Sequence, residues 1–178
     1  MKKYLLVLLT GTYIFQGCQT TIPVRDTVPP IFNFHISGDG LNLDINQNFD
    51  FDNKALYLKR DALYAIIFTA SDGRALERAR WEMPSRDVVL MNENEDDWIT
   101  LVTQPPEPQA TQWTGDPNNP ITAMYLAPGR FQALGGEQNG VINNFIFKFS
   151  ASDYHSNTTT RTLIVRITND DSHIGSRD

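Results

Sequence analysis

The chain has 178 residues, with 15 lysine and arginine side chains against 21 aspartate and glutamate side chains, and a formal net charge of −6. This length suits one domain, and an apolar content of 40% is sufficient for a core, which excludes wholesale disorder. An acidic chain is a poor candidate for neutralising the phosphates of a nucleic acid, so no nucleic acid is expected as a partner.

The first 17 residues have the arrangement of an export signal. Lys2 and Lys3 precede a mostly apolar stretch from Tyr4 to Phe15. A helix that crosses a bilayer needs about 20 apolar residues, so this stretch is too short to span but has the length of a signal-peptide core. Gly17 and Cys18 follow, and "YIFQGC" resembles the lipobox of bacterial lipoproteins. The resemblance implies a signal peptide over 1–17 and lipidation of the Cys18 thiol.

Cys18 is also the only cysteine in the sequence. A single exported thiol has no internal disulfide partner and is open to oxidation, which lipidation prevents. Two or three acyl chains anchor a protein stably in a membrane. With Gln19 next to the cysteine, the lipoprotein resemblance favours the outer membrane of a Gram-negative cell, so we expect a bacterial cell-envelope protein. An ordinary cleaved signal followed by a stray cysteine remains the alternative.

The rest of the chain predicts an all-β domain behind a tether. Residues 18–30 are polar and proline-bearing, as tethers are. Residues 53–66 show some helical spacing of apolar side chains, but the β-branched and aromatic residues that continue this stretch argue against a helix. Period-two alternation predicts strands over 31–37, 41–45, 78–83, 143–151 and 159–168. A stretch that is apolar on both faces predicts a central strand over 62–70, a short apolar stretch predicts one over 98–102, and two apolar stretches that flank Pro128 and Gly129 predict one over 123–134. Seven to nine short strands with glycine- and proline-rich loops predict an antiparallel β-sandwich over 31–170, followed by a flexible tail at 171–178.

Three stretches resemble bacterial immunoglobulin-like or cadherin-like domains. "DTVPPIFNF" is similar to their entry into the first strand, and "IIFTASDGRALERARWEM" to their second and third strands, with Trp81 facing the core. "FKFSASDYHSNTTTRTLIVRI" is similar to their last hairpin. The resemblance covers most of residues 26–169. It implies an immunoglobulin-like sandwich in which three connections meet at one end: B–C between 62–70 and 78–83, D–E between 98–102 and 123–134, and F–G between 143–151 and 159–168.

This end is the predicted recognition surface. It would gather Asp72, Asp153 and His155 with a long loop, "TQPPEPQATQWTGDPNNP", that carries Trp113 and Asp116. Asp72 and Asp153 either cap their own turns or serve as ligands of a Ca²⁺ ion, which takes six to eight oxygens. Trp113 either offers a flat apolar face to a sugar ring or covers the backbone of its own loop.

A basic row is predicted on one sheet face. Arg78, Arg80, Lys148 and Arg166 occupy outward positions on strands that are neighbours in the resembled topology. The row would meet phosphate or carboxylate groups, such as those of lipopolysaccharide or an acidic partner. The alternative is that Arg80 or Arg166 pairs with Glu82 across the strands.

No catalytic pattern emerges from the sequence. "SASDYHS" holds serine, acid and histidine close together, but adjacency in sequence rarely produces triad geometry. Zinc spacings, phosphate-binding glycine loops and nucleophile elbows are missing. We therefore expect a non-enzymatic, lipid-anchored module without a cofactor, Ca²⁺ excepted, that binds or scaffolds another envelope protein. The alternative is a glycan-binding or Ca²⁺-dependent adhesion module that uses the loop end.

Overall fold

The computed structural model describes residues 22, 25–83, 88–91, 99–101, 109–135 and 144–178. All the regular elements in these ranges are strands, which confirms the all-β prediction. They are β1 Ile31–Gly38, β2 Leu41–Asn46, β3 Lys54–Lys59, β4 Leu63–Met83, β5 Val88–Met91, β6 Ile99–Leu101, β7 Gln109–Thr114, β8 Ile121–Ala133, β9 Asn144–Asp153, β10 Thr158–Thr168 and β11 His173–Ser176. Within these ranges no helix has the length and apolarity needed to cross a membrane. Cys18 lies outside the described residues.

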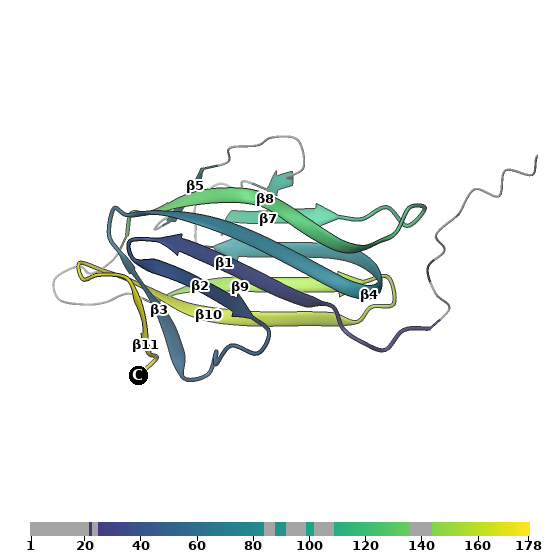
Figure 1. Ribbon diagram of the computed structural model, residues 1–178, viewed down its shortest axis with the longest axis horizontal. Coiled ribbons are helices and arrows are strands. Elements are labelled where there is room, and N and C mark those ends of the chain that lie inside the picture. The colour runs from purple at the N-terminus through teal and green to yellow at the C-terminus, as the bar shows by residue number, and fades with distance from the viewer. Residues whose placement is uncertain (1–21, 23–24, 84–87, 92–98, 102–108, 136–143) are drawn as a thin grey trace, which may run out of the picture.

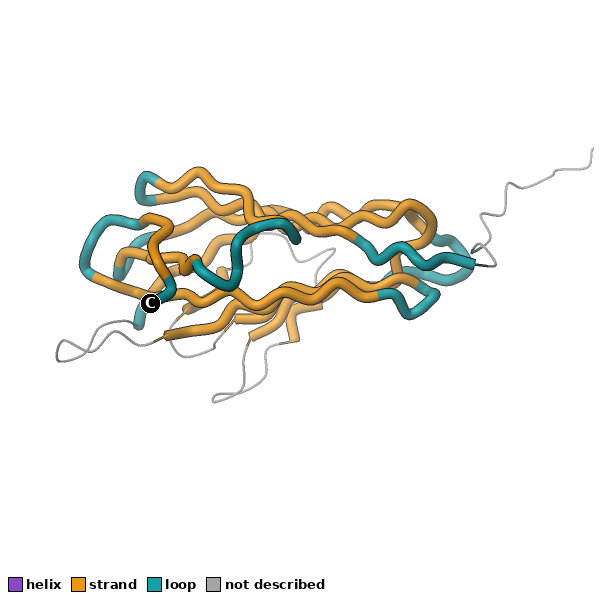
Figure 2. The backbone as a smooth tube through the Cα atoms, turned by 90° about the horizontal axis from the view of Figure 1, so that it is seen from below, coloured by secondary structure: helices purple, strands orange, loops and turns teal. Residues whose placement is uncertain are grey.

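The strands form two layers joined by the long strand β4 (Figures 1 and 2). The first part of β4, up to Ser71, pairs with β1 and β8. The second part, from Leu76, pairs with β9 and β7. We call the first layer, with β2, β1, β8 and β5, the N layer. The second, with β6, β7, β9, β10, β3 and β11, is the C layer.

A tight bend in β4 carries the chain from one layer to the other. The register shifts between Ser71 and Leu76, and Asp72 holds the bend. One carboxylate oxygen of Asp72 accepts hydrogen bonds from the backbone N–H groups of Arg74 at 2.8 Å and Ala75 at 2.9 Å. This is the turn interpretation of Asp72, in which an aspartate satisfies the backbone two and three residues ahead.

Aromatic rings fill the space between the layers. Phe34 of β1 lies 5.0 Å from Trp81 and 4.9 Å from Phe149, measured between ring centroids. Phe131 of β8 lies edge-on to Phe147 of β9 at 5.8 Å. All of these side chains are fully buried, so the predicted core position of Trp81 is confirmed. Rings at these distances add about 0.5–1.5 kcal/mol per pair beyond the area that they bury.

The expectation of a wholly antiparallel sandwich is wrong. β3 runs parallel to β10, with Ile164 opposite Ala55. The connection after β2 takes the chain from the N layer to the C layer, where β3 lies between β11 and β10 and runs in the same direction as β10. Alternation within a strand says nothing about the direction of its neighbour, so only the tertiary contacts reveal this pairing.

Three further segments differ from the prediction. β3 and β5 occupy stretches in which no strand was expected, and β7 lies within the stretch predicted as a long loop. The predicted flexible tail contains β11, which pairs with β3. Tyr57 of β3 explains why the tail forms a strand, because its ring stacks on His173 at 4.6 Å and its hydroxyl donates to the carbonyl of Ser176.

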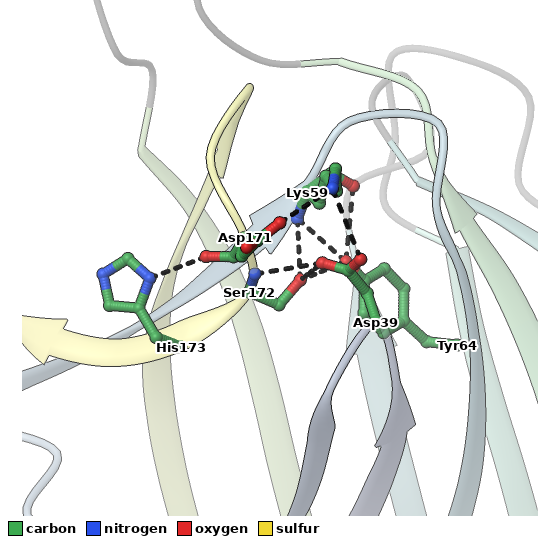
Figure 3. Close-up of polar contacts among 6 residues, drawn as sticks. All are labelled: Asp39, Lys59, Tyr64, Asp171, Ser172 and His173. Carbon is green, nitrogen blue, oxygen red and sulfur yellow. Dashed lines mark hydrogen bonds and ion pairs between the residues drawn. The ribbon is translucent and has the colours of Figure 1, made fainter.

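A polar network ties the C-terminal segment to the turn between β1 and β2 (Figure 3). Ser172 donates from its backbone N–H and its hydroxyl to one carboxylate oxygen of Asp39, at 3.0 and 2.7 Å. The buried hydroxyl of Tyr64 lies 2.6 Å from the Ser172 hydroxyl. Lys59 contacts Asp171 at 2.8 Å and Asp39 at 3.7 Å. The hydrogen bonds from Ser172, with a smaller effect from Lys59, hold the pKa of Asp39 below its ordinary value.

This network predicts a loss of stability in acid. A carboxyl group whose pKa is lower in the folded state contributes stability above the ordinary aspartate pKa of about 3.9 and loses it as the pH falls through the folded pKa. We expect the free energy of unfolding to decrease below about pH 4 more steeply for the wild-type chain than for Asp39→Asn. Asparagine also tolerates the positive φ of 46° at this position. Urea titrations from pH 2 to pH 7 measure the difference, and identical pH profiles would contradict the assignment.

Candidate functional site

The predicted recognition end is assembled in the structure. The β4 bend meets the turn between β9 and β10, where the backbone N–H of Tyr154 donates to the carbonyl of Ala75. The turn between β7 and β8 joins them, because Gly115 donates to the carbonyl of Glu77 at 2.7 Å. Asp72, Asp116, Asp153 and His155 therefore lie on connections that meet at one end of the two layers.

The carboxylates at this end are occupied by their own turns. Asp153 is buried, and one oxygen accepts from the backbone N–H groups of His155 and Asn157, each at 2.8 Å. Its other oxygen accepts from the Asn157 side-chain amide at 2.7 Å. Asp116 is exposed and accepts from the backbone and side chain of Asn118. These contacts have the geometry of turn caps, as the non-metal interpretation predicts.

Asp26, at the end of the predicted tether, joins this cluster. Its carboxylate, that of Asp153 and a ring nitrogen of His155 lie within 4.8 Å of one another. Asp26 accepts from the backbone of Val28 and lies 3.8 Å from the Arg74 guanidinium, and its carbonyl accepts from Asn157. The end of the tether is thus fastened to the recognition end. Asp72 is not part of this group of potential metal ligands. The predicted pairing of Asp72 with Asp153 around a Ca²⁺ ion stays a prediction.

Trp113 does not lie on a loop. It belongs to β7, opposite Ala79 of β4, and is half-buried against the aromatic core. Gly115 packs tightly between Trp113 and Tyr154. A Cβ added at Gly115 would come within 2.9 Å of both the Trp113 ring and the Tyr154 hydroxyl. Desolvation, with the Glu77 and Asp116 carboxylates nearby, raises the pKa of Tyr154. Trp113 therefore exposes less of its ring to a possible ligand than a tryptophan on a free loop would expose.

The basic row is divided between two places. Arg80 donates to Glu82 at 2.7 Å, and Lys148 lies 3.7 Å from the same carboxylate. Arg78 is exposed. Arg166 lies apart: it donates to Asn144, to the Tyr57 hydroxyl and to the carbonyl of Arg177, and its guanidinium lies over the Tyr57 ring. Arg80 pairs with Glu82 along the same strand, β4, and not across strands as expected, and the cross-strand partner of Glu82 is Lys148. Arg166 secures the C-terminal strand instead.

A groove of about 460 Å³ on the N layer was not predicted. It crosses β2, β1, β4 and β8, and none of its lining side chains is charged. Asn33, Asn46, Gln47, Thr69, Ser71, Ile31, Phe32, Ala70, Ala123 and Met124 line it. The lining comes from four strands that are far apart in the sequence, and the small side chains of Ser71 and Ala123 face each other across β4 and β8. No local pattern in the sequence reports such a depression.

Comparison with known proteins finds no family. No family model matches the chain, and neither does any curated protein. A crystal structure of ACE19, the collagen binding subdomain of the Enterococcus faecalis surface protein ACE, superposes with a TM-score of 0.33 and 9% sequence identity. The match covers 68% of this chain and 99% of that one. A similarity this low identifies neither the fold nor a partner.

Proposed function

We propose that the chain is a non-enzymatic binding module of immunoglobulin-like architecture, held at the bacterial cell envelope by a lipid on Cys18. Its partner is another envelope protein, and its binding site is the groove on the N layer. The observation that carries this proposal is the lining of the groove, which combines amides, hydroxyls and apolar side chains without a titratable group. General acid–base or nucleophilic chemistry needs such groups at the site, whereas binding does not.

The lining suits a peptide segment of a partner protein. Side-chain amides such as those of Asn33 and Asn46 both donate and accept, which matches backbone N–H and C=O groups. The Gln47 side-chain oxygen is buried and has no hydrogen-bond partner in the described part of the chain, so a donor from a ligand would satisfy it. Ile31 is 51% exposed at the rim and supplies apolar contact area.

The position of the groove favours a partner close to the membrane. Ile31 lines the groove and is the first residue of β1, directly after the tether. Because Asp26 is fastened to the domain, only residues 19–25 separate it from Cys18. Seven extended residues reach at most about 24 Å. The glycan or Ca²⁺-dependent alternative at the loop end stays a prediction.

Site-specific photo-crosslinking tests this proposal. A photoreactive residue at the exposed position Ala123 should capture one defined envelope protein in the native membrane. Ser71→Phe fills the groove and should abolish that adduct. Ser150→Phe places the same substitution at a half-buried, outward serine of the C layer and should leave the adduct intact. Adducts of equal yield in both variants would contradict the groove as the binding site.

A further inference from the structure

The outer face of the C layer carries an ordered array of cations and hydroxyl groups. The register places Arg80 beside Ser150, and Glu82 beside Lys148, on β4 and β9. β10 continues these rows with Thr160 beside Ser150 and Thr162 beside Lys148. We call these residues, together with Arg78 and Thr158 in the adjoining row, the β9 face. Its side chains repeat about every 6.8 Å along a strand and about every 4.8 Å between strands.

The β9 face is positive on an acidic protein. Three cations, Arg78, Arg80 and Lys148, lie beside two carboxylates, Glu82 and Glu77, the second of which accepts from Ser152 next to Arg78, so the local balance is 3 − 2 = +1, against −6 for the whole chain. Glu82 is 18% exposed and contacts both Arg80 and Lys148, which orients these two cations without cancelling the charge. Arg78 has no ion pair or hydrogen bond to any described residue. The face is therefore complementary to an anionic partner.

The hydroxyl groups indicate which anionic partner fits. The side chains of Ser150, Thr158, Thr160 and Thr162 have no protein partner within the described ranges, and the three threonines are exposed. Protein interfaces are centred on aromatic or large apolar anchors, which the β9 face lacks. Ile146, 52% exposed, lies one row beyond Lys148. Hydroxyl donors and acceptors beside spaced cations match a polymer that carries hydroxyl groups and regularly spaced carboxylates.

We propose that the β9 face binds an anionic polysaccharide, with carboxylates at Arg78, Arg80 and Lys148 and sugar hydroxyls at Ser150, Thr160 and Thr162. This surface lies on the layer opposite the groove and does not depend on the function proposed for the groove. Sugar and protein hydroxyls exchange hydrogen bonds at little cost, because each group both donates and accepts. The cations supply the attraction, which salt screens over about 10 Å at 0.1 M.

Binding to polygalacturonate tests the proposal on the mature chain. We expect the chain to bind polygalacturonate in about 0.05 M salt, to release it in about 0.5 M salt, and not to bind neutral dextran. Arg78→Gln and Lys148→Gln should each weaken binding roughly two- to five-fold, the range that exposed ion pairs provide. Lys54→Gln makes the same charge change on an exposed lysine of β3, two strands away from β9 in the C layer, and should leave binding unchanged.

Poly-glutamate separates a polysaccharide from an acidic protein. Thr162→Val removes a hydroxyl and keeps the shape, so it should weaken binding to polygalacturonate and not to poly-glutamate. Three outcomes overturn the proposal: no binding of polygalacturonate at low salt, an equal loss for Lys54→Gln and Lys148→Gln, or tighter binding of poly-glutamate than of polygalacturonate. The last outcome would assign the face to an acidic protein. Melting temperatures equal to that of the wild type establish that the variants are folded.

Discussion

Phe34→Ala is expected to lower the free energy of unfolding by about 3–5 kcal/mol, the range for removing a buried ring. Phe34 is fully buried on β1 and contacts Trp81, Phe147 and Phe149, which belong to the opposite layer. Its removal opens a cavity at the centre of the interface between the layers, where the strands on both sides restrict collapse. Urea unfolding followed by tryptophan fluorescence measures the change.

Ile146→Ala is the control for this prediction. Ile146 lies on β9 directly before Phe147, one of the same rings, but its side chain is 52% exposed on the outer face. Its truncation removes no core contact and should change the free energy of unfolding by less than about 1 kcal/mol. If Phe34→Ala and Ile146→Ala lowered the free energy of unfolding equally, the aromatic interface would not be the main source of stability between the layers.

Asp153→Ala is expected to destabilise the protein by about 2–4 kcal/mol, because it leaves three part-buried donors without their acceptor. The buried carboxylate of Asp153 accepts from the backbone N–H groups of His155 and Asn157 and from the Asn157 amide. Asn157 also holds the carbonyl of Asp26, so the substitution should loosen the end of the tether as well. Chemical denaturation measures the first effect, and hydrogen exchange at the backbone amides of residues 26–28 measures the second.

Asp116 provides a comparison, because its carboxylate also caps the backbone N–H two residues ahead but is exposed. Its carboxylate accepts from the backbone and the side chain of Asn118 at 2.8 and 3.1 Å. Water replaces these contacts when the carboxylate is removed, so Asp116→Ala should cost less than about 1 kcal/mol. An equal cost at the two positions would mean that burial does not set the strength of the Asp153 cap.

The alternation of apolar side chains located several strands correctly. β1, β2, β8, β9 and β10 occupy the stretches predicted for them to within a few residues, and Trp81 is buried. The turn at Asp72 was also predictable, since an aspartate caps the backbone that directly follows it. These features depend on residues close together in the sequence, where a side chain's polarity and the two-residue period of a strand are sufficient information.

Other features depend on residues that meet only after folding. β7 has few apolar residues, so its alternation is weak, and it becomes a strand because β4 presents an edge to it. β11 is held in place by hydrogen bonds from Tyr57 and Arg166 to the carbonyl of Ser176. Tyr57 lies 119 residues before Ser176 in the sequence, and Arg166 lies 10 residues before it. Arg166 was expected with the basic row, yet the contacts of the C-terminal strand remove it from that row.

The candidate sites divide along the same line. Residue types and their order were enough to expect an all-β body and an export signal, because each follows from local polarity. The meeting of the turns around Asp153 was implied by the resemblance to immunoglobulin-like domains. The addition of Asp26 to that cluster, the parallel pairing of β3 with β10, and the groove across four strands came from the folded arrangement alone. Strand order and direction are set by the burial of whole faces between the layers, and that energy depends on contacts that no short stretch of sequence contains.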